Sequence, residues 1–384
     1  MDRANLELAY YLADEKRVPV HLVSHFVEDQ LAGHPSVTLH LVPRPVGLHV
    51  LAERFLNVRG RLVCKAISAH HPGVRVIVNG GNCVWPGINW AHYVHQIWTP
   101  ESREAPWWFR SKDWLHHSLA KRDERAAFRI AQSVITNSEL TRRHVVDCFG
   151  LDPSRVRTVY LGSDPDWGEV TSLERVEARA ALGIPESKLV ALFVGALGFD
   201  RRKGFDLLLQ AWERLGADPA WNVDLVAAGG GAVSAWQNKI DRAGLGKRIR
   251  LLGYSNQVRQ LLAAADLLVS PARYEAYGLN VQEALCRGVP AMISTSAGIA
   301  ERYPAPLSAM LIPDPEDVSS LVERLRGWQR NVNEWKASFQ PLGKLLRSYT
   351  WKDMAAKMIA TVEGLEATTQ IGAYKATVSV AKRV

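Results

Sequence analysis

Long apolar runs, paired cysteines and a leader-like start are all lacking in this 384-residue sequence. No run of about 18 consecutive apolar residues occurs, so we expect no membrane-spanning helix. The N-terminus also lacks the basic, apolar and small-residue succession of a signal peptide. The cysteines show no CxxC or Cys/His spacing, so neither a disulfide framework nor a zinc site is expected. We therefore predict a cytoplasmic protein without a metal centre, whose cysteines are structural: Cys64, Cys83, Cys148 and Cys286.

Acidic residues are fewer than basic ones, and the formal net charge is +8. Such an excess favours an anionic partner, which could be a phosphorylated small molecule, a membrane surface or a nucleic acid. Nucleic acid is not expected, because the basic residues are spread along the chain and no zinc finger, basic zipper or aromatic RNA-binding signature occurs. The hydrophobic and charged fractions, 47% and 22%, are those of an ordinary globular protein.

Short apolar runs alternate with amphipathic stretches along the chain, which is typical of parallel α/β folds. Because the chain is longer than one hydrophobic core usually supports, we expect two domains. Turn-forming residues without periodicity mark a linker at 161–172. We predict a first domain over 1–162, a second over 163–350, and a terminal helix over 351–384 that crosses back to the first domain and ends in a tail. The expected strands are 20–24, 37–42, 74–79, 90–94, 133–136 and 156–160, then 189–194, 223–228, 249–252, 267–270, 291–294 and 309–312.

The chain opens on a predicted helix, with no strand before it. In a doubly wound sheet the first strand lies near the centre, so its absence predicts a gap in the middle of the first sheet. We therefore expect that the sequence lacks its true N-terminal segment.

Segment 270–290, SPARYEAYGLNVQEALCRGVP, joins an apolar strand to a helix through a polar turn. Gly278 lets the backbone approach a ligand, and the N–H groups of Tyr277, Gly278 and Leu279 open a helix, where an anion is favoured. Glu275 precedes this turn and Glu283 follows it. Carboxylates beside a phosphate site suit the hydroxyl groups of a sugar or ribose. Taken singly, each glutamate could equally be an ordinary solvated residue.

Segment 193–212, FVGALGFDRRKGFDLLLQAW, places a basic, glycine-containing loop between a strand and a helix. Arg202 and Lys203 in this loop suit a diphosphate, which arginine can bind in a bidentate manner. A solvated basic turn is the alternative for this segment alone.

Three further features are weaker. His95 ends a predicted strand, where a histidine can act near a reacting phosphate, and His92, three residues earlier, faces the opposite side. Tyr254 and Ser255 follow another strand, and Tyr254 could equally be a core or rim aromatic. The run 106–114, PWWFRSKDW, could contact a membrane interface, a lipid-linked acceptor or a sugar acceptor, or it could pack inside a loop.

Segment 270–290 resembles the signature of glycosyltransferase family 4, two glutamates separated by seven residues, here Glu275 and Glu283. The resemblance runs from the first helix to 351–354. It implies the GT-B fold, two Rossmann-like doubly wound domains facing a cleft. Relatives begin with a strand and a glycine-rich loop, and the first domain here lacks that first strand.

The basic loop is similar to the family's phosphate loop, with Arg202, Lys203 and Gly204 in the matching order. The similarity departs at Ala196, where many relatives have an arginine directly after the glycine. Arg201 is a candidate to take that role.

The resemblance implies a retaining, metal-independent hexosyl transfer from a UDP- or GDP-sugar to a hydroxyl acceptor, a glycan or lipid-linked glycan of cell-surface polysaccharide synthesis. No cofactor is implied. A peripheral contact with the inner face of the membrane is a further option. The alternatives are a nucleotide-sugar-binding protein with little transferase activity, a GT-B-like nucleotide-sugar epimerase and a phosphorylase.

The resemblance also implies a role for each candidate residue. Glu275 would orient the donor sugar, Glu283 would bind the ribose hydroxyls, and His95 would place the sugar and stabilise the transition state. The remaining donor-binding candidates are Arg202, Lys203, Tyr277, Gly278 and Leu279 for the diphosphate, and Tyr254 and Ser255 for the nucleobase.

Overall fold

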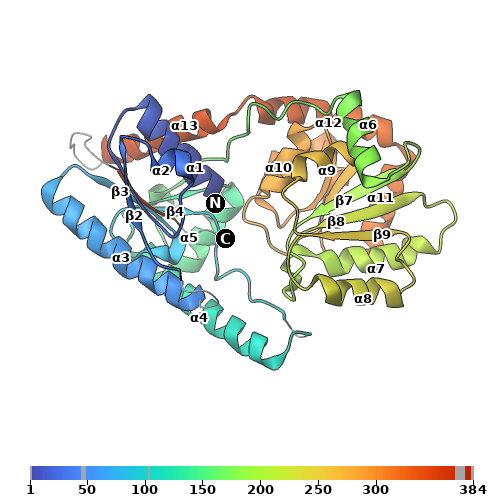
Figure 1. The fold of residues 1–384 in the computed structure, drawn as a ribbon, viewed down its shortest axis with the longest axis horizontal. Helices are drawn as coiled ribbons and strands as arrows, with labels where there is room; N and C mark the ends of the chain where they lie inside the picture. Colours follow the sequence, from blue (N-terminus) through green and yellow to red (C-terminus); the bar gives the residue numbers. More distant parts are fainter. Residues whose placement is uncertain (1, 45–48, 103, 368–376, 382–384) are drawn as a thin grey trace. The chain divides into compact units, whose positions relative to one another are not determined.

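The computed structural model describes residues 2–44, 49–102, 104–367 and 377–381. The chain forms two compact units (Figure 1). One unit consists of Met1–Thr99, Ser111–Gly162 and Tyr349–Val384, and the other of Pro100–Arg110 and Ser163–Ser348. We call them the N-terminal and the C-terminal unit. Segment Pro100–Arg110 thus belongs to the C-terminal unit, which the sequence did not predict.

The N-terminal unit is built on a parallel sheet, with the strand order β2-β1-β13-β3-β4-β5-β6. Strands β1, β3, β4 and β5 are largely buried, as is usual where helices cover both faces, whereas the edge strand β2 is partly exposed. The strands are β1 (Val20–Ser24), β2 (Val37–Leu41), β3 (Arg75–Asn79), β4 (Ile88–Ala91), β5 (Ser133–Thr136), β6 (Val156–Thr158) and β13 (Thr377–Ala381).

Strand β13 corrects the predicted gap. The chain does open on a helix, but the centre of the sheet is filled, because β13 pairs in parallel with β1 on one side and with β3 on the other. In Figure 1 this deep red strand lies among the blue strands of the N-terminal part. The tail after the last helix therefore supplies the strand that the sequence interpretation found missing.

Two hydrophobic clusters hold α3, α4 and α5 on the sheet. One joins α3 to β1 and β3 through Val23, Leu56, Val63 and Val78, and the other joins α4 and α5 to β4, β5 and β6. No described helix is long and apolar enough to cross a membrane. The helices are α1 (Asp2–Tyr10), the π-helix η1 (Tyr11–Glu15), α2 (Asp29–Ala32), α3 (His49–His70), η2 (Gly80–Asn82), α4 (Trp107–Ile130), α5 (Glu139–Phe149), η3 (Pro153–Arg155) and α13 (Trp351–Ala367), with the first turn of α4 in the C-terminal unit.

The C-terminal unit has a six-stranded parallel sheet in the order β12-β11-β10-β7-β8-β9. The chain starts at β7 in the middle, builds outward to β9, and returns to β10 on the other side of β7. This is the doubly wound order, so the sequence prediction of a Rossmann-like α/β fold is confirmed. The strands are β7 (Leu189–Val194), β8 (Val223–Ala228), β9 (Ile249–Gly253), β10 (Leu267–Ser270), β11 (Ala291–Ser294) and β12 (Leu311–Ile312).

Two α-helices of this unit were not predicted. Helix α6 follows directly on the turn-rich linker and begins with a capping box between Thr171 and Glu174. Helix α12 contains Pro341, a residue that normally interrupts a helix. The helices are α6 (Ser172–Leu182), η4 (Arg201–Lys203), α7 (Phe205–Gly216), α8 (Val233–Arg242), α9 (Val258–Ala264), α10 (Leu279–Cys286), η5 (Gly298–Arg302), η6 (Ala305–Met310), α11 (Val318–Arg330) and α12 (Val332–Arg347).

Candidate functional site

The C-terminal unit has its topological switch point between β7 and β10, which are neighbours in the sheet although three strands apart in the chain. In open parallel sheets, ligands bind at the carboxyl ends of the strands at this point, because the two following loops diverge there. Here those loops are 195–204 after β7 and 271–278 after β10. Both were singled out from the sequence, and the topology brings them together.

Close contacts fix the two loops against each other. Gly204 has φ +75°, and a Cβ at this position would lie 2.0 Å from the carbonyl oxygen of Pro271, so only glycine fits. Farther along the sheet edge, a Cβ on Gly229 would lie 1.7 Å from the Gly195 carbonyl oxygen. The backbone N–H of Gly195 donates to Ala228, at 3.0 Å. The glycines therefore let the loops after β7, β8 and β10 pack backbone to backbone.

Lys203 and Glu275, one from each loop, form an ion pair. Burial tends to raise the pKa of Glu275, but the charges of Lys203 and Arg202 outweigh it and hold the pKa below its ordinary value. The backbone of Glu275 is fixed too, since its N–H donates to Ser296 at 3.1 Å and its carbonyl accepts from Gly298 at 3.0 Å. The switch point thus carries an ionised carboxylate beside two cations.

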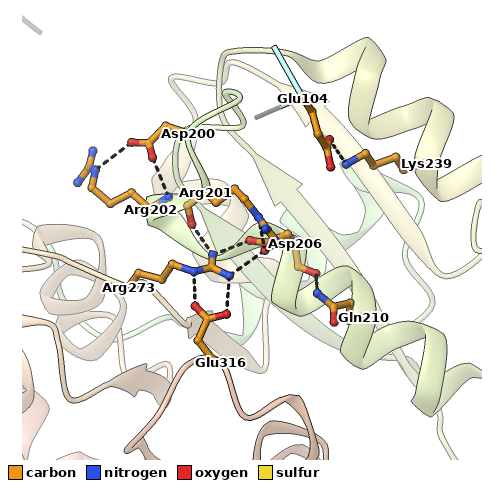
Figure 2. Close-up of polar contacts among 9 residues, drawn as sticks. All are labelled: Glu104, Asp200, Arg201, Arg202, Asp206, Gln210, Lys239, Arg273 and Glu316. Carbon is orange, nitrogen blue, oxygen red and sulfur yellow. Dashed lines mark hydrogen bonds and ion pairs between the residues drawn. The ribbon is translucent and has the colours of Figure 1, made fainter. Parts of the chain in front are cut away.

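A cluster of four charged side chains supports the basic loop, and Figure 2 shows it. We call Arg201, Asp206, Arg273 and Glu316 the arginine clamp. The guanidinium of Arg273 donates to both carboxylate oxygens of Asp206, at 2.8 and 2.9 Å, and also binds Glu316. Arg201 donates to the same Asp206 carboxylate from Nε, at 2.9 Å. Asp206 and Arg273 are each only 8% exposed.

The clamp also holds the loop backbone. Arg273 donates from its side chain to the carbonyl of Arg201, at 2.6 Å, and from its N–H to the carbonyl of Arg202, at 2.8 Å. Burial tends to lower the pKa of Arg273. The hydrogen bonds to Asp206 and Glu316 outweigh this effect and raise the pKa of Arg273 above its ordinary value. The guanidinium of Arg201 is bound to Asp206, and its side chain is 37% exposed. Its role in place of the arginine that many relatives have at the position of Ala196 stays a prediction.

The turn at Gly278 opens α10 as the sequence predicted. Gly278 is the N-cap residue with φ +106°, and its carbonyl accepts the N–H groups of Val281 and Gln282, at 3.0 and 3.2 Å. The two N–H groups before these have no acceptor within the helix. Asn280 donates to the carbonyl of Val194 at 2.9 Å, which ties this helix start to the end of β7. Tyr277, in contrast, is buried, and its hydroxyl binds Gln282. Glu283 lies within α10 and is partly exposed.

Tyr254 and Ser255 follow β9, two strands from β7. Tyr254 is 82% exposed, so the alternative of a core aromatic is excluded. Ser255 accepts a hydrogen bond from the N–H of Gln257 at 3.1 Å, which shapes the turn before α9. Gly229 bonds Gly253 at 2.7 Å, so this turn lies beside the glycine loop after β8.

His95 belongs to the N-terminal unit. It lies in a turn four residues after the end of β4 rather than at the strand end, because the strand stops at Ala91. Its ring packs against those of Tyr93 and His117, with centroids 4.7 and 5.7 Å away. His92, which the sequence ranked lower, packs against Trp90 instead, at 4.4 Å.

The turn that carries His95 is held by Glu124 of α4, which sequence reasoning missed. The Glu124 side chain is fully buried, and its two carboxylate oxygens accept the N–H groups of His95 and Gln96, at 2.9 and 3.2 Å. Burial raises the pKa of Glu124 to about 8, although these two bonds and Lys121 act in the opposite direction. The sequence pattern that could have identified Glu124 is a glutamate on the buried face of an amphipathic helix.

The stability of the N-terminal unit is expected to depend on pH through Glu124. Folding raises its pKa from 4.5 to about 8, so the folded form binds the proton more tightly than the unfolded form. The stabilisation is therefore full below about pH 4.5 and is lost as the pH rises through about 8. In urea unfolding, the free energy of unfolding of wild type should fall with rising pH, by up to a few kcal/mol more than that of Glu124→Gln. Gln changes the hydrogen bonds equally at every pH, so a pH-independent difference would contradict this expectation.

The aromatic run 106–114 is not a packed loop, and that alternative was wrong. It forms the first turns of α4, and Trp107, Trp108 and Trp114 are all exposed. Phe109 contacts Phe199 of the loop after β7, with ring centroids 5.4 Å apart. Among the described residues, no group of three or more His, Cys, Asp or Glu side chains could hold a metal ion.

Known proteins resemble both halves of the chain. Residues 1–167 match the family described as "Glycosyltransferase Family 4", and residues 174–336 match "Glycosyl transferases group 1". An uncharacterised glycosyltransferase of Methanocaldococcus jannaschii is 25% identical over 238 residues, which cover 59% of this chain and 58% of that protein. The matches span about half the length of such curated relatives.

Solved structures show the same fold. Sucrose-phosphate synthase of Thermosynechococcus elongatus has a TM-score of 0.69 at 18% identity. The match covers 92% of this chain and 100% of the synthase chain. Anabaena HepE, solved in complex with UDP and glucose, has a TM-score of 0.67 at 16% identity and covers 94% of this chain and 95% of its own. These likenesses confirm the GT-B class of fold.

Proposed function

The two family matches together show that the chain belongs to glycosyltransferase family 4. From this membership we propose the reaction that the chain catalyses. The proposed reaction moves a glycosyl group from a UDP- or GDP-sugar to a hydroxyl acceptor, with retention of the anomeric configuration. The observation that carries it is the pairing of Lys203 with Glu275 at the switch point of a doubly wound sheet.

The diphosphate is proposed to lie between Arg202, Lys203 and the start of α10 at Gly278 and Leu279. Positive charge and helix N–H groups suit its phosphate oxygens, and the same groups stabilise the charge that develops on it as it leaves. We therefore assign this role to protein groups rather than to a metal ion. Lys203 is partly exposed, at 23%, so its ammonium group can bind phosphate on one side while Glu275 stays on the other.

The two glutamates are proposed to bind the sugar portions of the donor. Glu275 is ionised and fixed by its backbone bonds, so it can orient the transferred sugar by accepting its hydroxyl protons. Glu283 would accept the ribose hydroxyls. Tyr254, being exposed, can stack on the nucleobase beside Ser255. Tyr277 contributes through its backbone and by bracing Gln282.

His95 is proposed to place the donor sugar and stabilise the transition state. Its turn is held by the hydrogen bonds that its N–H groups donate to Glu124, which is the kind of support that a catalytic side chain needs. The proposed acceptor is a glycan or lipid-linked glycan of cell-surface polysaccharide synthesis, and the proposed place is the cytoplasm, in peripheral contact with the inner face of the membrane.

A thermal-shift screen against UDP-, GDP- and ADP-sugars tests the donor. A ligand that binds the folded form raises stability by about 2.7 kcal/mol at one hundred times its dissociation constant, so the true donor should raise the Tm clearly above the others. Binding without turnover over a full acceptor panel would favour a nucleotide-sugar-binding protein, and consumption of donor without acceptor would favour an epimerase. No shift with any nucleotide sugar would contradict the proposal.

A further inference from the structure

Helix α3 has a second apolar face on its outer side. Its inner face is buried in the core through residues such as Leu56 and Val63. Phe55, Val58 and Leu62, spaced three and four residues apart, lie on the opposite side and are 45%, 59% and 57% exposed. A surface helix normally turns polar residues outward, so this stripe needs a reason.

Positive charge flanks the outer stripe. Arg54, Arg59, Arg61 and Lys65 are exposed on the two sides of it. The single acidic residue between positions 52 and 70 is Glu53, and it points away, toward His116 of α4, at 2.9 Å. The outer face of α3 is therefore apolar along its middle and cationic along its edges.

Helix α4 continues the same chemistry where it meets α3 at the Glu53–His116 contact (Figure 1). In the part of α4 that belongs to the N-terminal unit, Trp114 and Leu115 are 70% and 48% exposed. Lys112 is exposed beside them. Tryptophan favours the boundary between water and lipid, because its ring is apolar and its N–H is polar.

The charge pattern decides which partner fits. A two-fold dimer would place this face against its own copy, so the four cations of one α3 would meet four like charges. A bilayer of anionic lipid instead offers phosphate groups for the cations and a hydrocarbon boundary for the stripe. We propose that the outer face of α3, together with the exposed Trp114 and Leu115 of α4, binds an anionic membrane surface.

Membrane binding would bring the enzyme to a lipid-linked acceptor, and only this purpose rests on the proposed function. The binding itself is measured without any transfer. Vesicles of phosphatidylcholine alone, and of phosphatidylcholine mixed with phosphatidylglycerol, are sedimented with the full chain. Wild type should bind the anionic vesicles at least about tenfold more tightly, and added salt should weaken that binding.

Two double variants separate the contributions. Val58→Ser with Leu62→Ser should abolish binding, and Arg54→Glu with Arg61→Glu should remove the preference for anionic lipid. The matched control is Leu173→Ser on α6, because Leu173 is 67% exposed but lies beside Glu174 and Glu177. This control should bind as wild type does.

Equal binding to both vesicle types, or wild-type binding by both double variants, would overturn the proposal. So would a wild-type dimer in sedimentation velocity that the Val58/Leu62 variant dissolves, because the face would then be a protein interface. The thermal shift with the nucleotide sugar is recorded for every variant. An intact shift shows that the variant is folded, and it separates failure on vesicles from failure of the donor site.

Discussion

Replacing Lys203 with alanine is expected to lower the rate of glycosyl transfer by about 100- to 1,000-fold, the usual cost of removing one group that stabilises developing charge. The substitution removes a cation at the switch point and leaves the Glu275 side chain, which is 16% exposed, without its ion-pair partner. Glu275→Gln, which keeps the shape but removes the charge, should lower the rate by a comparable factor. Initial rates with the donor found in the thermal screen measure both effects.

Lys239→Ala is the matched control for this pair of variants. Lys239 lies in the same unit and forms an ion pair with Glu104 (Figure 2), and the side chains of the two residues are 33% and 64% exposed. Its removal should leave the transfer rate within about twofold of wild type. If Lys203→Ala and Glu275→Gln retained rates as high as Lys239→Ala, the assignment of the donor site would be wrong.

Replacing Asp206 with alanine is expected to destabilise the C-terminal unit by about 3 kcal/mol or more, because it leaves the buried Arg273 short of a partner. Arg201 would also lose its carboxylate, so the basic loop would lose the bonds that shape it. The unfolding midpoint in urea measures the loss. Donor affinity should fall too, even at temperatures where the variant is folded.

Glu104→Ala provides the comparison for Asp206→Ala. Glu104 is an exposed partner, so breaking its pair with Lys239 should cost less than about 1 kcal/mol. A loss in Asp206→Ala no greater than that in Glu104→Ala would show that the arginine clamp does not stabilise the loop.

Local patterns predicted most of the strands. The bounds of β7, β8, β10 and β11 agree with the sequence prediction, because each is a short apolar run ended by glycine, proline or polar residues. Strand β13 was not predicted, because it is a strand only through its pairing with β1 and β3, more than 300 residues away in the chain. Its segment alone resembles a tail.

The candidate site shows the same division. Gly278 and the basic loop could be recognised, since a helix start and a cluster of cations are local features. The arginine clamp could not be recognised. Its members Asp206 and Arg273 come together only because the loop after β10 packs on the loop after β7. Glu124 was missed for a related reason, since its role depends on a turn 29 residues earlier in the chain.

Calorimetric titration of UDP and GDP into wild type and Lys203→Ala is the most direct test of whether the loops after β7 and β10 bind a nucleoside diphosphate. We expect one of the two nucleotides to bind wild type saturably, and Lys203→Ala to bind it at least about tenfold more weakly, as the loss of a charge-assisted hydrogen bond requires. Equal affinities for wild type and variant, or binding of neither nucleotide, would contradict a donor site at Lys203 and Glu275.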